Sequence, residues 1–499
     1  MTAIVAGAPS TSKTNWNAIN WRIVRLYVYR LQVRIAKATK LKRWGKVKTL
    51  QHLLTRSFTA KLLAVKSVIS NKGSRSPGVD GVKWKTPRQR WEAVLSLKTK
   101  GYKALPLRRI YIPKANGKFR PLGIPTMYDR AMQALYALAL KPVAETTGDY
   151  NSYGFREKRS LHDAVKQGFI VLANRSSAKW ILEADIKGCF DNINHEWMLE
   201  NIHLPKHILQ QWLKSGYMEA NNLFSTEAGT PQGGIISPIL CNMVLDGLEN
   251  RVIKGRNKKR RKLNVIRYAD DFIVTGASPE ILQCEIKPEI VCFLKERGLT
   301  LSPEKTQISQ IDDGFDFLGF NFRKHKNKLL IKPARKKTTD LLSKLKVFFR
   351  NCLGRPFSAV LPKLNSILRG WAYAHRHVVA KDIMNFLDME IFKGICKWLK
   401  TSNQSMKWSE IKQRYMGHHK GRLEIGTLIA NRRQRKWISL FKMADLSIHY
   451  HWKICGDANP YAPECQEYFK QRNKYRRNLA RRDRCFLSAS SYEKIAKWK

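Results

Sequence analysis

A pair of adjacent aspartates between two β-prone runs constrains this chain more than any other feature. Residues 265–274 read VIRYADDFIV, and Val, Ile, Tyr and Phe all favour strands. Neighbouring side chains on a straight strand point to opposite faces, so both acids reach one site only across a turn. The run therefore predicts a tight hairpin with Asp270 and Asp271 at its tip. Aspartates also favour turns for local hydrogen-bonding reasons, so the pair alone leaves an ordinary turn open.

Positive charge is the outlier of the composition. The 499 residues contain 93 Lys and Arg against 38 Asp and Glu, which gives a formal net charge of +55. An imbalance of this size repels itself in a compact protein and indicates a bound polyanion. Because basic residues run along the whole chain instead of forming one amphipathic helix, nucleic acid is favoured over a membrane surface.

Cysteine usage and hydropathy indicate an intracellular protein. The nine cysteines include no Cys-x₂-Cys pair, which argues against a zinc ribbon and against a disulfide scaffold. Residues 1–10 have neither the basic start nor the apolar stretch of a signal peptide. No run of about 18 apolar residues is long enough to span a bilayer. We expect reduced thiols and a soluble, cytoplasmic protein without a membrane partner.

Periodicity and turn signals outline the organisation of the chain. Residues 15–65 predict two amphipathic helices with a basic outer face, and 335–399 predict a later helical domain. Two β-prone runs flank Asn116-Gly117, which is a strong hairpin signal. An apolar strand within 179–190 contains Asp185 at its end. Since strands and helices interleave up to about residue 322, we expect an α/β core.

Asp185 supplies a third carboxylate for the predicted hairpin. If its strand lies beside the hairpin in one sheet, Asp185, Asp270 and Asp271 can together hold two Mg²⁺ ions. One of these Mg²⁺ ions lowers the pKa of a primer 3′-hydroxyl, and the other neutralises triphosphate charge as pyrophosphate leaves. A helix-capping role is the alternative for Asp185.

The Asn116-Gly117 hairpin carries a basic residue on each arm. Lys114 and Arg120 are positioned to close over a nucleotide, because Lys and Arg both suit triphosphate oxygens. A solvated basic hairpin is the alternative for these two residues.

A series of sequence blocks appears in one order along the chain. The blocks are SPGVDG (76–81), the 114–125 hairpin, SYGFR (152–156), ADIKGCFD (184–191), GTPQGG (229–234), YADD (268–271), GLTLSPEKT (298–306) and FDFLGF (315–320). Over residues 15–450 the series resembles the reverse transcriptases encoded by bacterial group II introns, also called maturases. The resemblance implies an α/β (α+β) right-hand polymerase, with fingers and an antiparallel palm sheet followed by a helical thumb, the maturase X domain.

The resemblance also implies a division of the chain. Its expected parts are an N-terminal basic helical extension (1–70), fingers and palm (71–330), the thumb or X domain (331–445, with helices from about 336 to 440) and a basic, DNA-binding-like tail (446–499). Many relatives end in a zinc-containing endonuclease with paired cysteines. Cys455, Cys465 and Cys485 are too irregularly spaced for that, so we expect no complete endonuclease and no cleavage of the target bottom strand.

The function that the resemblance implies is RNA-directed DNA polymerisation on intron RNA, with two Mg²⁺ ions as cofactors. The implied partners are the intron RNA template, a DNA primer or target and dNTPs, in the bacterial cytoplasm. Assistance to splicing and mobility through RNA binding is also implied, and a homodimer is left open. Two alternatives remain at this point. They are a non-enzymatic RNA-binding maturase and a retron or defence-type reverse transcriptase.

Three further nucleotide-binding residues are implied by match to the family. Phe190, five residues after Asp185, stands where related polymerases carry a ring against the sugar. Such a ring clashes with a 2′-hydroxyl and favours deoxynucleotides. Gln232 in the Pro-Gln-Gly-Gly loop and Arg108 match other pocket positions. An ordinary core phenylalanine and a turn glutamine are the alternatives for Phe190 and Gln232.

Overall fold

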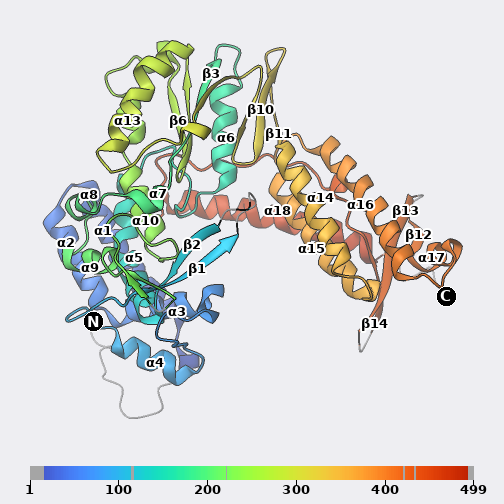
Figure 1. Ribbon diagram of the computed structural model, residues 1–499, viewed down its shortest axis with the longest axis horizontal. Coiled ribbons are helices and arrows are strands. Elements are labelled where there is room, and N and C mark those ends of the chain that lie inside the picture. The colour runs from blue at the N-terminus through green and yellow to red at the C-terminus, as the bar shows by residue number, and fades with distance from the viewer. Residues whose placement is uncertain are drawn as a thin grey trace. The chain divides into compact units, whose positions relative to one another are not determined.

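The chain folds into two compact units. The computed structural model describes residues 16–113, 117, 119–220, 222–419, 422–431 and 434–492. The first unit comprises residues up to 164, 180–308 and 454–467, and the second comprises 165–179, 309–453 and the residues from 468 onward. Figure 1 shows both as ribbons, with helices and strands labelled where there is room.

A group of N-terminal helices packs around one long buried helix, α5 (Met127–Thr147). The helices that contact it are α1 (Trp21–Lys40), α2 (Trp44–Arg56) and α3 (Phe58–Ser70). The sequence predicted two helices in this region, and that number was wrong. The Ser57 hydroxyl accepts from the Ala60 N–H and caps α3, which separates it from α2.

A four-stranded sheet follows in the order β2-β1-β4-β5. Its strands are β1 (Leu107–Pro113), β2 (Phe119–Ile124), β4 (Tyr217–Glu219) and β5 (Asn222–Phe224). β1 and β2 pair antiparallel from Arg108↔Ile124 to Pro113↔Phe119, so the predicted hairpin is confirmed. Lys114 and Asn116, at its turn, lie outside the described residues.

A second four-stranded sheet, in the order β6-β7-β3-β8, holds the aspartates. Its strands are β3 (Trp180–Asp185), β6 (Asn264–Tyr268), β7 (Asp271–Gly276) and β8 (Gln307–Gln310). β7 pairs antiparallel with both β6 and β3. Phe272 and Val274 are fully buried in the core that this sheet shares with α5. The antiparallel palm sheet expected from the sequence is therefore present.

Shorter helices complete the first unit. They are α4 (Pro87–Ser96), α7 (Cys189–Asn192), α8 (His195–Asn201), α9 (Lys206–Leu213), α10 (Ser237–Leu245), α11 (Leu248–Ile253), α12 (Lys258–Arg261) and α13 (Lys287–Lys295), with a π-helical turn at Ile281–Ile286. Single 3-10 turns lie at Trp16–Ala18, Lys72–Arg75 and Pro303–Lys305. α6 (Leu161–Leu172) begins in the first unit and ends in the second.

The second unit combines helices with two small sheets. Its elements are β9 (Phe315–Phe317), β10 (Phe320–His325), β11 (Lys328–Pro333), α14 (Arg335–Arg350), α15 (Phe357–His375), α16 (Lys381–Ser402), α17 (Trp408–Tyr415), β12 (Met416–His419), β13 (Arg422–Asn431), β14 (Gln434–Ser439) and most of α18 (Gln466–Tyr492). α14 and α16 pack against each other (Figure 1). The helical domain expected over 335–399 is thus present.

Residues 416–439 differ from the expectation that helix continues to about 440. The described residues of this stretch, 416–419, 422–431 and 434–439, form the antiparallel sheet β12-β13-β14. The reason is a change of period, since Ile425 and Thr427 are buried on β13 while Leu428 is exposed. A Cβ on Gly426 would lie 2.5 Å from the Trp437 ring across the pair, so the strands meet closely at a glycine.

No helix within the described ranges is both long enough and apolar enough to cross a membrane.

A buried ion pair anchors the strand that leads to the aspartates. The Arg267 side chain on β6 is 1% exposed, and its Nη2 lies 2.5 Å from Asp246 Oδ1. Its Nη1 also donates to Asn242 Oδ1 at 3.2 Å. A buried charge that loses its partner destabilises a protein strongly. Arg267 should therefore contribute more to the free energy of unfolding than any exposed arginine of this unit.

We predict that Arg267→Met lowers the free energy of unfolding by about 3–5 kcal/mol, because Asp246 is left buried without its cation. The matched control is Arg251→Met, which breaks the exposed Arg251–Glu289 pair and should change stability by less than about 1 kcal/mol. Urea denaturation measures both. Equal losses in the two variants would contradict the anchoring role.

Candidate active site

The turn between β6 and β7 carries two of the predicted carboxylates. Tyr268 pairs with Asp271, so Ala269 and Asp270 form a two-residue tip. Ala269 has a φ of 60°, in the left-handed region that a residue with a Cβ adopts only when its surroundings enforce it. The tight hairpin predicted from the sequence is confirmed.

Residues 151–154 pack beneath this turn and hold it. The Arg267 N–H donates to the Asn151 carbonyl and the Tyr153 N–H donates to the Arg267 carbonyl, both at 2.9 Å. A Cβ on Gly154 would lie 2.5 Å from the Ala269 nitrogen, so only glycine lets the two backbones approach this closely. The SYGFR block thus packs directly against the turn between β6 and β7.

Asp185 lies beside the turn as the last residue of β3. In the β3–β7 ladder it stands directly opposite Asp271. Cα atoms of directly opposed antiparallel residues are about 4.5–5.5 Å apart, and their side chains share one face. The structure therefore brings together all three aspartates that the sequence singled out.

Burial and mutual repulsion raise the pKa values of Asp270 and Asp271. Burial, followed by the charges of Asp185 and Asp270, raises the pKa of Asp271 to about 7. Burial and the Asp185 charge also raise the pKa of Asp270, while Lys305 and Arg120 act in the opposite direction. Like charges held this close disfavour ionisation unless a cation joins them.

Lys305 supplies one such cation. Its Nζ lies 2.6 Å from Asp185 Oδ2, and this hydrogen bond together with the three aspartate charges raises the pKa of Lys305. The Ser302 N–H donates to the Asp185 carbonyl at 2.8 Å, and the Lys187 N–H donates to the Thr300 carbonyl at 3.0 Å. The backbone of the GLTLSPEKT block is thereby fixed alongside the end of β3.

The donor chemistry of the site fits a hard divalent cation. Carboxylate oxygens are the ligands that Mg²⁺ prefers. A cation there would offset both the burial and the neighbouring charges that raise the pKa of Asp271. As the described side chains stand, no three Asp, Glu, His or Cys residues are already arranged around an ion position.

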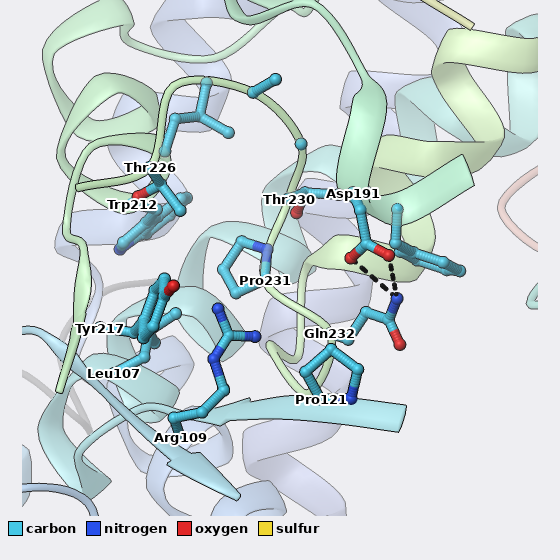
Figure 2. Close-up of a pocket in the computed structure, with 15 residues that line it drawn as sticks. Leu107, Arg109, Pro121, Asp191, Trp212, Tyr217, Thr226, Thr230, Pro231 and Gln232 are labelled. Atoms are coloured by element: carbon cyan, nitrogen blue, oxygen red, sulfur yellow. Dashed lines mark hydrogen bonds between the residues drawn. The ribbon is translucent and has the colours of Figure 1, made fainter. Parts of the chain in front are cut away.

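A cavity of about 220 Å³ lies close by in the same unit, and Figure 2 shows its lining. Phe190 on α7 and Gln232 on the Pro-Gln-Gly-Gly loop both line it. Phe190 is half-buried, and the ring of Phe155 meets it edge-on at 6.3 Å. The structure thus brings these two predicted nucleotide-binding residues together.

The basic residues predicted for nucleotide binding are distributed differently. Arg109, rather than Arg108, lines the cavity, with its guanidinium 3.6 Å from the centre of the Tyr217 ring (Figure 2). Neighbours on β1 face opposite sides, so Arg108 does not share this cavity. Arg120 on β2 is exposed, and its charge opposes the rise in the pKa of Asp270 that burial causes. Lys114 lies outside the described residues.

Sequence reasoning missed three residues of the site, which are Lys305, Asp191 and Arg109. The block containing Lys305 was noticed, but nothing in it indicated an ion pair with a residue 120 positions away. Asp191 directly follows Phe190, and this adjacency was the signal that could have drawn attention to it. Arg108 and Arg109 are neighbours on one predicted strand, and the sequence alone did not tell which of the two faces the cavity.

Comparisons with known proteins agree on one family. The N-terminal domain of reverse transcriptase matches residues 16–97, the reverse transcriptase (RNA-dependent DNA polymerase) domain matches 112–322, and the group II intron maturase-specific domain matches 338–416. Protein YkfC of Escherichia coli is 32% identical over 300 residues, which is 51% of this chain and 78% of that protein. The group II intron-encoded protein LtrA of Lactococcus lactis is 28% identical over 414 residues, 67% of this chain and 68% of its own.

The chain belongs to the group II intron-encoded reverse transcriptase/maturase family. Its reverse transcriptase domain makes it an RNA-directed DNA polymerase, and its maturase-specific domain carries the splicing role. Polymerases with this domain are generally metal-dependent, and the family binds intron RNA and DNA. The retron-type alternative does not account for the maturase-specific domain.

We predict that Asp271→Asn stabilises the metal-free reverse transcriptase increasingly as pH rises from 5 to 8. The pKa of Asp271 is about 7 in the folded protein against the usual 3.8, so the folded state holds the proton more tightly and stability falls through this range. Removing the charge should restore on the order of 1–4 kcal/mol at pH 8.

Chemical denaturation in EDTA at several pH values measures this effect. The matched control is Asp313→Asn, which replaces an exposed aspartate outside the site and should change stability by less than about 0.5 kcal/mol. A pH-independent difference for Asp271→Asn would show that the carboxylate is not destabilised in the folded protein.

Proposed function

We propose that this reverse transcriptase copies intron RNA into DNA at the site formed by Asp185, Asp270 and Asp271. The observation that carries the proposal is the register of β3 and β7, which sets Asp185 opposite Asp271. The proposed substrates are deoxynucleoside triphosphates, added to the 3′ end of a DNA primer or target strand.

The three aspartates would hold two Mg²⁺ ions, which supply Lewis acidity at the primer 3′-hydroxyl and offset the charge of the triphosphate. The chain's own residues prepare the site for them. The constrained turn keeps Asp270 and Asp271 in fixed positions, so little reorganisation is needed at the moment of reaction. Lys305 offsets part of the carboxylate charge until the ions arrive.

The nucleotide pocket in this proposal combines Lys114, Arg120, Phe190 and Gln232. Arg108 stays a prediction as a nucleotide contact outside the cavity, since it does not line it. Among the basic residues, Arg120 has the best evidence for a place in this pocket, because its charge acts on the pKa of Asp270. Phe190 would lie against the sugar and exclude a 2′-hydroxyl, since it lines the cavity beside Gln232. We add Arg109 to this group because it faces the same cavity.

Nucleic-acid binding would use the basic surfaces at both ends of the chain. On α1, Arg22, Arg25, Arg30 and Arg34 are exposed beside the exposed ring of Tyr27, which suits phosphates and unpaired bases. We propose the divisions 1–70, 71–330, 331–445 and 446–499 as extension, fingers and palm, thumb, and DNA-binding tail. The proposed compartment is the bacterial cytoplasm. A homodimer stays a prediction that light scattering tests.

We predict that Asp270→Asn abolishes primer extension on an RNA template. Losing a carboxylate that holds the ions should lower the rate by about 10³-fold or more, since metal charge stabilisation is worth several kcal/mol. Affinity for the RNA should stay within about threefold, because phosphate contacts dominate it. Incorporation of dNTPs with Mg²⁺ and a filter-binding assay measure the two effects.

Asp313→Asn serves as the control and should extend primers at the wild-type rate. An Asp270→Asn variant that keeps its activity would remove the turn from the proposed site. A wild type that incorporates no dNTP would leave only the splicing role.

We predict that Phe190→Val lowers discrimination against ribonucleotides. A smaller side chain opens room for the 2′-hydroxyl, and differences of this size in a pocket are worth about tenfold or more. Single-nucleotide incorporation gives kcat/KM for each dNTP and its rNTP counterpart. The control is Phe224→Val, an exposed ring stacked on Tyr217, and an equal change in both variants would argue against a sugar contact by Phe190.

A further inference from the structure

Both carboxylate oxygens of Asp191 accept hydrogen bonds from the side-chain amide of Gln232. The Gln232 Nε2 lies 2.9 Å from Oδ1 and 2.9 Å from Oδ2 of Asp191 (Figure 2). The two residues are 41 positions apart, and both line the cavity beside Phe190. An exposed carboxylate next to a triphosphate site would repel the substrate. Asp191 should therefore have a function that outweighs this repulsion.

The backbone around this contact is held from two sides. The Thr230 N–H donates to the Phe190 carbonyl at 2.6 Å, and the Gly123 N–H donates to the Gln232 carbonyl at 2.8 Å. Gly229 has a φ of +86°, and a Cβ there would lie 2.6 Å from the Asp191 carbonyl oxygen. The loop backbone is therefore fixed against α7 and β2, and the freedom that remains lies in the Gln232 side chain.

Asp191 restricts the Gln232 side chain to one orientation of its amide group. An ionised carboxylate only accepts hydrogen bonds, whereas an amide group offers a donor NH₂ at one end and an acceptor oxygen at the other. The Gln232 NH₂ must therefore face Asp191, and Oε1 must face away from it. Without the carboxylate, the amide can rotate and present either end to the nucleotide.

We propose that Asp191 is a positioning residue that acts through Gln232, so that a carbonyl oxygen faces a hydrogen-bond donor of the incoming nucleotide. This inference rests on the proposed polymerase function of the same site. The donor is either a sugar hydroxyl or an amino group of the base. Because Asp191 follows Phe190 directly and the loop binds the Phe190 carbonyl, the acceptor and the sugar-facing ring are set by one piece of backbone.

The test measures kcat and KM for each dNTP separately in primer extension by the full chain. Asp191→Ala should raise KM by up to about tenfold, the value of the one neutral hydrogen bond between the Gln232 oxygen and the nucleotide, with kcat changed less than about threefold. Asp191→Asn keeps an acceptor oxygen and should recover most of the loss. The control is Glu196→Ala, which removes an exposed acid on α8 and should leave KM unchanged.

A double variant distinguishes positioning from an independent effect. If Asp191 acts through Gln232, the Asp191→Ala/Gln232→Ala variant has the same KM as Gln232→Ala alone. Equal KM increases for all four dNTPs identify a sugar hydroxyl as the donor, whereas an effect absent for thymidine triphosphate identifies a base amino group. Melting temperatures and duplex affinity should match wild type in each variant.

Two results would overturn the inference while leaving the polymerase intact. They are additive effects of the two substitutions and an unchanged KM for Asp191→Ala in an active enzyme. A wild type that extends no primer would instead overturn the proposed function, and the inference with it.

Discussion

The register of β3 against β7 is the constraint on which the rest of the site depends. It fixes Asp185 opposite Asp271, and the two-residue tip adds Asp270. Holding three carboxylates together is unfavourable without a cation. The surrounding structure compensates through the buried Arg267–Asp246 pair below β6, the glycine contact under Ala269 and the ammonium group of Lys305.

The nucleotide side of the site is organised by backbone contacts more than by side chains. The loop at Gly229–Gln232 approaches α7 so closely that a Cβ at Gly229 would meet the Asp191 backbone. As a result, Phe190, Asp191 and Gln232 belong to one rigid arrangement next to the aspartates. The backbone segments that carry Gln232 and Phe190 are thereby held together, which in the proposed function suits recognition of a sugar by shape and hydrogen bonding together.

Local signals predicted the elements of this fold best where a turn has its own chemistry. The β1–β2 hairpin followed from Asn116-Gly117, and the β6–β7 hairpin followed from two β-prone runs on either side of the aspartate pair. Predictions failed where helix and strand periods compete or a cap intervenes. Residues 416–439 became strands because their pattern changes to alternation, and a single serine at position 57 divided one predicted helix into two.

By itself, the sequence determined the chemistry of this reverse transcriptase. The three aspartates and the excess of basic residues are features from which phosphoryl transfer on nucleic acid was predicted directly, and the resemblance of the sequence blocks to the family implied the roles of Phe190 and Gln232. Only the tertiary structure decided which neighbours tune them. Lys305 reaches Asp185, Asp191 orients Gln232 and Arg109 takes the cavity face of β1. These contacts join segments far apart in the chain, and their geometry depends on strand register and close backbone packing, which local sequence patterns do not encode.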